Sequence, residues 1–245
     1  NPPLTQSGEY PNFFRTIAPD DAQARTQIDF CLDKLKAKTI AIVHDKGDYG
    51  KGLAEFAKAF LEKDSRGKMV LYEGITPGAV DYSAVINKVR RSKADVLLYG
   101  GFHPEASKLI QQMRRKNMKT IFISDDGVKD ITFIKVAGKY AEGVYATGPM
   151  DTTKNPMAIA AIEEHRKTYG SDPGAFFLNA YAAATAMLEG IQIAGTSDFD
   201  ALSKTLRSNY FETPLGRISF DERGDAIGVG FAVYQVQDGQ YVEIK

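Results

Sequence analysis

The stretch from Ala94 to Val128 holds the feature that most restricts the fold of this chain. A short apolar run over residues 95–99 is long enough for a strand buried on both faces, and the pair Gly100-Gly101 interrupts it at once. Residues 106, 109, 110 and 113 are then apolar at the spacing of an amphipathic helix, and residues 120–123 predict a second strand. A strand, a helix and a strand in this order predict two parallel strands joined by a crossover helix.

Each strand of this stretch ends in a polar turn that contains glycine. Phe102 follows the first strand, and Asp125 and Asp126 follow the second. Ligands of open parallel sheets bind outside the carboxyl ends of the strands. We therefore expect Phe102 and Asp126 at one edge of the sheet, an aromatic face beside a carboxylate.

Strand and helix alternate from about residue 15 to residue 147. Further strands are expected at 13–18, 38–44, 69–75 and 143–147, with a helix over 19–35, a turn over 45–50 and other helices between them. This alternation predicts an α/β fold, a parallel sheet with helices on both faces.

The pattern changes after residue 148. Helices are expected at 157–169, 176–193 and 199–206, followed by short β segments at 217–220, 229–236 and 241–244. The helix over 176–193 is apolar nearly all round, which predicts burial, although few strands are expected there for it to pack on. Either a partner covers this helix, or part of its domain lies outside the chain.

Charge and composition exclude several classes of protein. Lys plus Arg and Asp plus Glu number 31 each, without the basic excess that is typical of nucleic-acid binders. No apolar run approaches the roughly 20 residues of a membrane span, and no leader is evident, so a signal peptide is expected to have been removed or never to have existed. Cys31 falls on an apolar helical stripe and is expected to be a buried thiol. The three histidines lie far apart, so neither a metal site nor a cofactor is expected.

Four segments together resemble one protein family. They read TIAIVHDKGDYGKGLAEF, DYSAVINKVRRSKADVLLYGGFHPEASKLIQQMR, ISDDGV and DPGAFFLNAYAAATAM. They resemble the leucine/isoleucine/valine-binding proteins, the type I periplasmic substrate-binding proteins of ABC transporters. The resemblance covers nearly the whole chain in order, and HDK-x-x-YG followed by YGG-x-x-PE is fairly specific to the branched-chain amino-acid group.

The resemblance implies two α/β lobes, joined by three strands, with the ligand in the cleft between them. Residues 1–16 and 149–228 would form part of the first lobe, and residues 17–148 and 229–245 the second. The chain resembles the family from a point roughly one third of the way in. The first lobe would thus lack most of its sheet and the serine- and threonine-rich turns that hold the ligand's carboxylate. The sequence leaves open whether that segment was deleted, cleaved or supplied by another chain.

The resemblance also implies four ligand-binding residues. Tyr49 and Phe102 match aromatic residues that line the cleft from the second lobe, and Asp126 matches an acidic residue that binds the ligand's α-ammonium. Phe176 matches an aromatic residue of the first lobe that touches the ligand's side chain. Taken alone, Asp126 could equally cap a helix, Tyr49 could lie on the surface, and the two phenylalanines could belong to the core. Family members commonly have glutamate and tyrosine where this chain has Asp126 and Phe102, which leaves the identity of the ligand open.

The function implied is capture of an apolar amino acid (leucine, isoleucine, valine or phenylalanine) outside the cytoplasm. Closure of the lobes would be followed by delivery to an ABC transporter permease, with no catalytic residue. One alternative is a sensor domain of a receptor or regulator that uses the same fold. A third class is an enzyme, because Asp125 and Asp126 at a strand end are typical of phospho-acceptor or metal sites. That class would need a phosphate-binding glycine loop or more carboxylates nearby, and the sequence shows neither.

Overall fold

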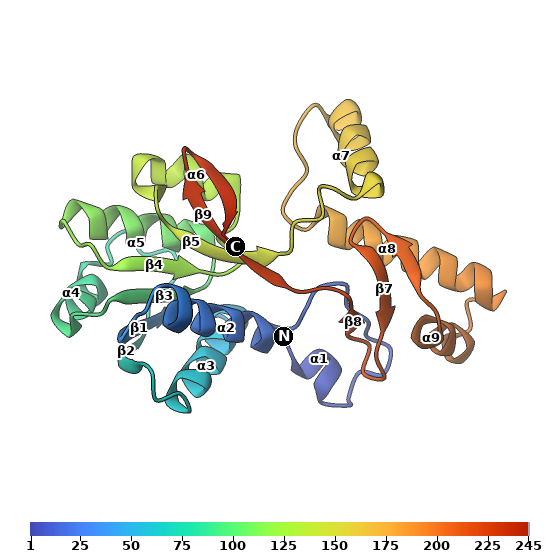
Figure 1. Cartoon of the computed structure of the whole chain (residues 1–245), viewed down its shortest axis with the longest axis horizontal. Helices are drawn as coiled ribbons and strands as arrows, with labels where there is room; N and C mark the ends of the chain where they lie inside the picture. Colours follow the sequence, from blue (N-terminus) through green and yellow to red (C-terminus); the bar gives the residue numbers. More distant parts are fainter. Residues whose placement is uncertain (245) are drawn as a thin grey trace. The chain divides into compact units, whose positions relative to one another are not determined.

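The computed structural model describes residues 1–244, which form two compact units (Figure 1). Unit 1 consists of residues 1–19 and 149–230, and unit 2 consists of residues 20–148 and the chain from residue 231 onward. The chain therefore passes from one unit to the other three times. The lobes expected from the sequence have their boundaries at residues 17, 149 and 229.

Unit 2 is built on a seven-stranded sheet with the order β10-β9-β5-β4-β3-β1-β2. Strands β1 to β5 pair as parallel neighbours, and β9 and β10 form an antiparallel pair at one edge. This confirms the parallel sheet predicted from the sequence. The strands are β1 Thr39–His44, β2 Lys68–Gly74, β3 Val96–Gly100, β4 Ile121–Ser124, β5 Tyr145–Pro149, β9 Phe231–Gln237 and β10 Gln240–Ile244.

Helices cover both faces of this sheet. Successive residues of β3 alternate between two hydrophobic cores, Leu97 and Tyr99 in one, Val96 and Leu98 in the other. The first core is closed by α4, α5 and α6, and the second by α2 and α3. The helices are α2 Asp20–Asp29, which continues as a π-helical turn Phe30–Lys34, α3 Asp48–Glu62, α4 Ser83–Ser92, α5 His103–Arg115 and α6 Ile131–Ala137.

The buried thiol predicted at Cys31 is confirmed. Cys31 is fully buried in the second core, and burial raises the pKa of its thiol to about 12. The thiolate, which is the nucleophilic form, is therefore disfavoured at neutral pH.

Unit 1 contains a small antiparallel sheet of order β6-β7-β8 and a small hydrophobic core around Phe211, Ile218 and Phe220. A buried ion pair between Arg15 and Asp225 (Nε to Oδ1, 2.6 Å) ties the N-terminal segment to this sheet. The elements are α1 Pro3–Gln6, α7 Pro156–Tyr169, α8 Phe177–Ala194, α9 Phe199–Ser208, β6 Phe211–Thr213, β7 Gly216–Phe220 and β8 Ala226–Ile227.

Two expectations from the sequence are wrong. Residues 13–18 do not form a strand, and only Arg15 makes a single bridge, to Asp225. The reason is that β8 is only two residues long, so the strand beside this segment is too short to extend the pairing beyond one bridge. The second concerns α8, which is not buried all round. Its buried residues follow a single stripe, whereas Met187 and Leu188 are 55% and 68% exposed.

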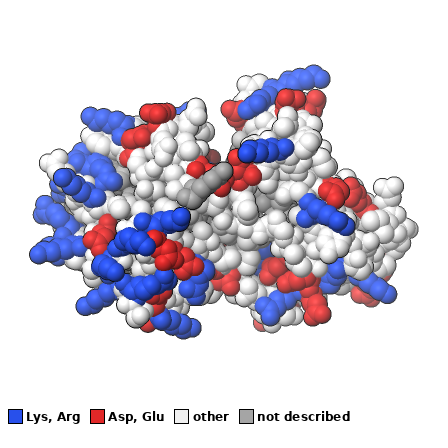
Figure 2. Space-filling view, in the orientation of Figure 1, with Lys and Arg blue, Asp and Glu red and all other residues white. Residues whose placement is uncertain are grey.

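Across residues 1–244, none of the helices is both long and apolar enough to span a bilayer. The zero net charge hides an uneven distribution: basic residues outnumber acidic ones in unit 2, and the reverse holds in unit 1. Figure 2 shows lysine and arginine gathered over unit 2, on the left of the view. Several of them end helices, such as Arg90 and Arg91 in α4, where a positive charge complements the helix dipole.

Candidate functional site

The turns that follow β1, β3 and β4 are held together at the carboxyl edge of the sheet. The Asp45 N–H donates to the Gly100 carbonyl (3.1 Å), and the His103 N–H donates to the Gly127 carbonyl (3.1 Å). The fully buried Asp125 carboxylate accepts from the N–H groups of Gly101 (2.8 Å) and Gly127 (3.0 Å). Both oxygens of Asp125 are thereby engaged, so its role is to fix the turns. Among residues 1–244, no cluster of three His, Cys, Asp or Glu side chains is arranged to hold a metal ion.

A close backbone approach brings the start of α3 to the same edge. A Cβ atom on Gly50 would lie 2.5 Å from the Gly100 carbonyl oxygen and 2.5 Å from Asp45 Oδ1. Only glycine leaves the room for this contact. The helix begins at Asp48, inside the stretch expected to be a turn, so Tyr49 lies in its first turn.

Tyr49, Phe102 and Asp126 come together at this edge. The Tyr49 hydroxyl donates to Asp126 Oδ1, and the rings of Tyr49 and Phe102 lie 5.5 Å apart between centroids, inclined at 45°. Phe102 is 49% exposed and Asp126 is 8% exposed. The structure therefore groups three of the four residues selected from the sequence, and their role as ligand contacts stays a prediction.

Burial dominates the electrostatics of this group. It raises the pKa of Asp126, and hydrogen bonds from Tyr49 and Gln23 oppose that rise while the nearby Asp20 adds to it. The pKa of Asp125 is raised well above its usual range by burial and by the charge of Asp126. Burial and both carboxylates also raise the pKa of Tyr49, which therefore stays a neutral hydrogen-bond donor.

This arrangement suits a ligand that combines a cationic group with an apolar body. A carboxylate forms its strongest hydrogen bonds with a charged donor such as an ammonium. Two aromatic rings beside the carboxylate offer an apolar wall to an aliphatic side chain. A cation beside Asp126 would also offset the cost of ionising a buried carboxyl group.

The fourth predicted residue, Phe176, belongs to unit 1. It occupies the position directly before α8 and is 46% exposed. Its role as a ligand contact stays a prediction.

Gln23, on α2, is a polar contact of the site that the sequence analysis missed. Its side chain is fully buried and hydrogen-bonds to Tyr49. The sequence contains a pattern that could have indicated Gln23. Gln23 and Gln27 lie four residues apart, beside the apolar positions Ala24 and Ile28 on one side of a helix. Polar residues on a buried helix face indicate a buried network.

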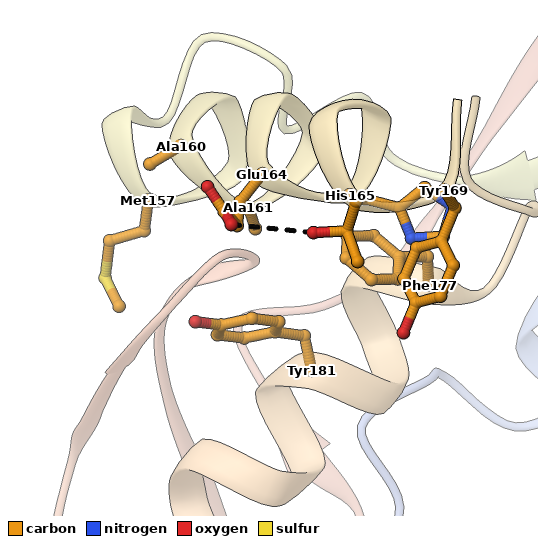
Figure 3. A pocket seen from close by; sticks show the side chains of 9 residues that line it. Met157, Ala160, Ala161, Glu164, His165, Tyr169, Phe177 and Tyr181 are labelled. Carbon is orange, nitrogen blue, oxygen red and sulfur yellow. Dashed lines mark hydrogen bonds between the residues drawn. The ribbon is translucent and has the colours of Figure 1, made fainter. Parts of the chain in front are cut away.

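Unit 1 has a hollow of its own, between α7 and α8 (Figure 3). It measures about 660 Å³, and its walls include Met157, His165, Phe177 and Tyr181. The His165 ring packs between Tyr169 and Phe177, with centroids 4.7 and 4.9 Å away. None of the four predicted residues lines this hollow, and its polar groups do not converge on one point, so we do not assign the ligand site to it.

Comparison with known proteins identifies related sequences. The family model described as periplasmic binding protein matches residues 2–240. The leucine-, isoleucine-, valine-, threonine- and alanine-binding protein of Pseudomonas aeruginosa is 35% identical over all of this chain and 65% of its own length. The Leu/Ile/Val-binding protein of Escherichia coli is 35% identical over 95% of this chain and 62% of its own length. The chain thus spans just under two thirds of these relatives.

Solved structures show the same fold. A leucine-binding protein, LivK, from Thermotoga maritima superposes with a TM-score of 0.90 at 26% identity, over 100% of this chain and 70% of that one. A solute-binding protein from Rhodopseudomonas palustris in complex with benzoate has a TM-score of 0.86 at 18% identity, over 99% of this chain and 67% of its own. The fold is therefore shared by proteins with chemically different ligands.

Proposed function

Since this chain belongs to the periplasmic binding protein family, we propose that it captures an apolar amino acid without changing it chemically. Leucine, isoleucine and valine are the first candidates, followed by phenylalanine. The observation that carries this proposal is the group of Tyr49, Phe102 and Asp126, a buried carboxyl beside two aromatic rings.

Each part of the ligand has a partner in this proposal. Asp126 accepts hydrogen bonds from the α-ammonium, and Tyr49 and Phe102 contact the aliphatic side chain. We assign Phe176 to the same side chain, from the other lobe. The names of the two related proteins from Pseudomonas and Escherichia, which include leucine, isoleucine and valine, support this ligand class.

The Asp126 carboxylate also argues against a second class of ligand, anions such as benzoate that have no ammonium group. The Rhodopseudomonas protein in complex with benzoate shows that the fold alone does not select amino acids. An anion without an ammonium would meet Asp126 as a like charge, which disfavours binding. We therefore propose that the carboxylate restricts this site to ligands with a cationic group.

We further propose that the two units act as the two lobes of a solute-binding component of an ABC transporter. Closure of the lobes on the amino acid, by hinge motion, would create the form that a permease recognises. The protein would act in the periplasm or elsewhere outside the cytoplasm. We propose that the part of the relatives' length not spanned here, joined to this chain or supplied as another, covers the exposed side of α8.

Replacing Asp126 tests the proposed function. In the full-length protein, Asp126→Ala leaves an ammonium in a closed site without its counter-charge, and the affinity should fall by about two orders of magnitude or more. Isothermal titration calorimetry with leucine measures the loss. A fall of less than tenfold would remove Asp126 from the site and with it the observation on which the proposal stands.

A further inference from the structure

A buried glutamine of α2 contacts the proposed ligand site from behind. Gln23 is fully buried, on the same side of the helix as the core residues Ala24 and Ile28. A buried amide costs stability unless its donors and acceptor are satisfied. The partners of Gln23 therefore indicate why a polar residue occupies this position.

The side chain of Gln23 uses both ends of its amide. Its Oε1 accepts from the Tyr49 hydroxyl (3.2 Å), and its Nε2 donates to Thr147 Oγ1 (3.0 Å). The Gln23 amide also holds down the pKa of the Asp126 carboxyl group. One side chain thus hydrogen-bonds to Tyr49 and lowers the pKa of Asp126, the two polar groups that unit 2 contributes to the proposed site.

Thr147 and Gln27 fix the far side of Gln23. Gln27 Nε2 donates to Thr147 Oγ1 (3.1 Å) and to the Ser124 carbonyl (2.9 Å). Ser124 Oγ in turn donates to the Tyr99 carbonyl (2.8 Å), so the network reaches across β5, β4 and β3. Because all of these side chains are buried, Gln23 is held in one place.

The Tyr49 hydroxyl has one proton and two acceptors within reach. It donates either to Asp126 Oδ1 or to Gln23 Oε1. Donation to Gln23 releases a lone pair of Asp126, which can then accept from an ammonium. Without the Gln23 carbonyl the second position is lost: the hydroxyl stays on Asp126, as in the ligand-free wild type, and the carboxylate loses the effect of the Gln23 amide.

We propose that Gln23 is a positioning residue: it directs the Tyr49 hydroxyl and the Asp126 carboxylate so that the carboxylate can accept from a ligand's ammonium group. This inference rests on the proposed function. It adds a residue that acts through Asp126 and Tyr49.

Gln27 supplies a matched control. It is an equally buried glutamine one helical turn away in the same network, but its hydrogen bonds go to Thr147 and Ser124. Gln23→Met and Gln27→Met each remove one buried amide while keeping a similar side-chain volume. A role in stability alone would leave the pH dependence of binding unchanged in both variants, whereas positioning of Asp126 would change it in Gln23→Met only.

The experiment measures leucine affinity against pH in the full-length wild type and the two variants. Loss of the hydrogen bond from Gln23 should raise the pKa of Asp126, so the Gln23→Met binding curve should move to higher pH, with about tenfold weaker binding at pH 7. The titratable groups facing Asp126 are Asp20, Asp125 and the neutral hydroxyl of Tyr49, which all three proteins retain. In Gln27→Met, the midpoint of the pH dependence of leucine binding should equal that of the wild type.

A titration of the Asp126 carboxyl group by NMR, without ligand, gives a second readout that does not depend on amino-acid binding. The Asp126 pKa should be higher in Gln23→Met than in wild type and Gln27→Met. If Gln23→Met does not fold, Gln23→Glu, which keeps the size and adds a negative charge, should raise that pKa further. Equal Asp126 pKa values in wild type and a folded Gln23 variant would overturn the inference. A wild type that binds no amino acid would overturn the proposed function instead, and the titration would still decide the role of Gln23.

Discussion

Asp126 must satisfy two opposing demands. It is 8% exposed, and burial disfavours its charged form, yet the ammonium ligand that we propose requires that charge. Hydrogen bonds from Tyr49 and Gln23 offset part of the cost in the ligand-free protein. The residue is therefore expected to lower the stability of the free protein in exchange for binding.

Asp126→Asn should make the ligand-free protein more stable at pH 7. A carboxyl group whose pKa is raised by folding contributes stability that is fully present below the unfolded pKa, about 3.9, and is lost as the pH rises through the folded pKa. Asparagine undergoes no such loss and can still accept from Tyr49. Denaturant unfolding at pH 7 and pH 4 should show a gain at pH 7 that vanishes near pH 4. A less stable variant at pH 7 would show that burial is not the dominant effect on Asp126.

The sequence predicted that Phe102 and Asp126 would lie close together, but it did not predict the buried residue Gln23 that contacts Tyr49. Phe102 and Asp126 follow strand ends, and parallel strands bring their carboxyl ends to one edge, so their proximity follows from topology. The contact of Gln23 with Tyr49 depends on how α2 packs on α3. No local sequence pattern encodes that packing, and the identity of a residue as glutamine does not indicate whether its side chain is buried.

At the scale of elements, the placement of α3 depends on a glycine. Gly50→Ala would place a Cβ atom 2.5 Å from the Gly100 carbonyl, so the first turn of α3 must move and take Tyr49 with it. We expect a loss of about 1–3 kcal/mol in the free energy of unfolding, together with weaker amino-acid binding.

Gly52→Ala, in the same helix, is the control for that change. A Cβ atom on Gly52 would meet no atom within 4 Å, so alanine should stabilise α3 by about 0.5–1 kcal/mol. Chemical denaturation of both variants measures the difference. Equal effects of the two substitutions would contradict the close approach of α3 to the turn after β3.

Long periodic elements were predictable, and short or context-dependent ones were not. The strand over 96–100 and the helix over 103–115 stand within a few residues of their predicted positions, because apolar spacing defines both. Strands β6 and β8, of three and two residues, are too short to show alternation. The first turn of α3 lies inside residues 45–50, which were expected to form a turn, and tertiary contacts decided otherwise.

At the scale of the whole molecule, exposed apolar residues of α8 should drive self-association of the 245-residue chain. Met187, Leu188 and Ile193 are all more than half exposed, and clustered apolar surface of this kind is typical of an interface. Light scattering should show oligomers whose mass rises with concentration. Leu188→Glu should reduce the mass, because it places a charge within the exposed apolar surface. A monomer at every concentration would contradict this expectation.

The most direct test of the proposed function is a thermal-shift screen of the full-length protein against the twenty amino acids. Ligands that bind only the folded state raise the unfolding temperature. Leucine, isoleucine or valine should give the largest shift, phenylalanine a smaller one, and Asp126→Ala should abolish all of them. A largest shift with aspartate, glutamate or arginine, or no shift with any amino acid, would contradict capture of an apolar amino acid by Tyr49, Phe102 and Asp126.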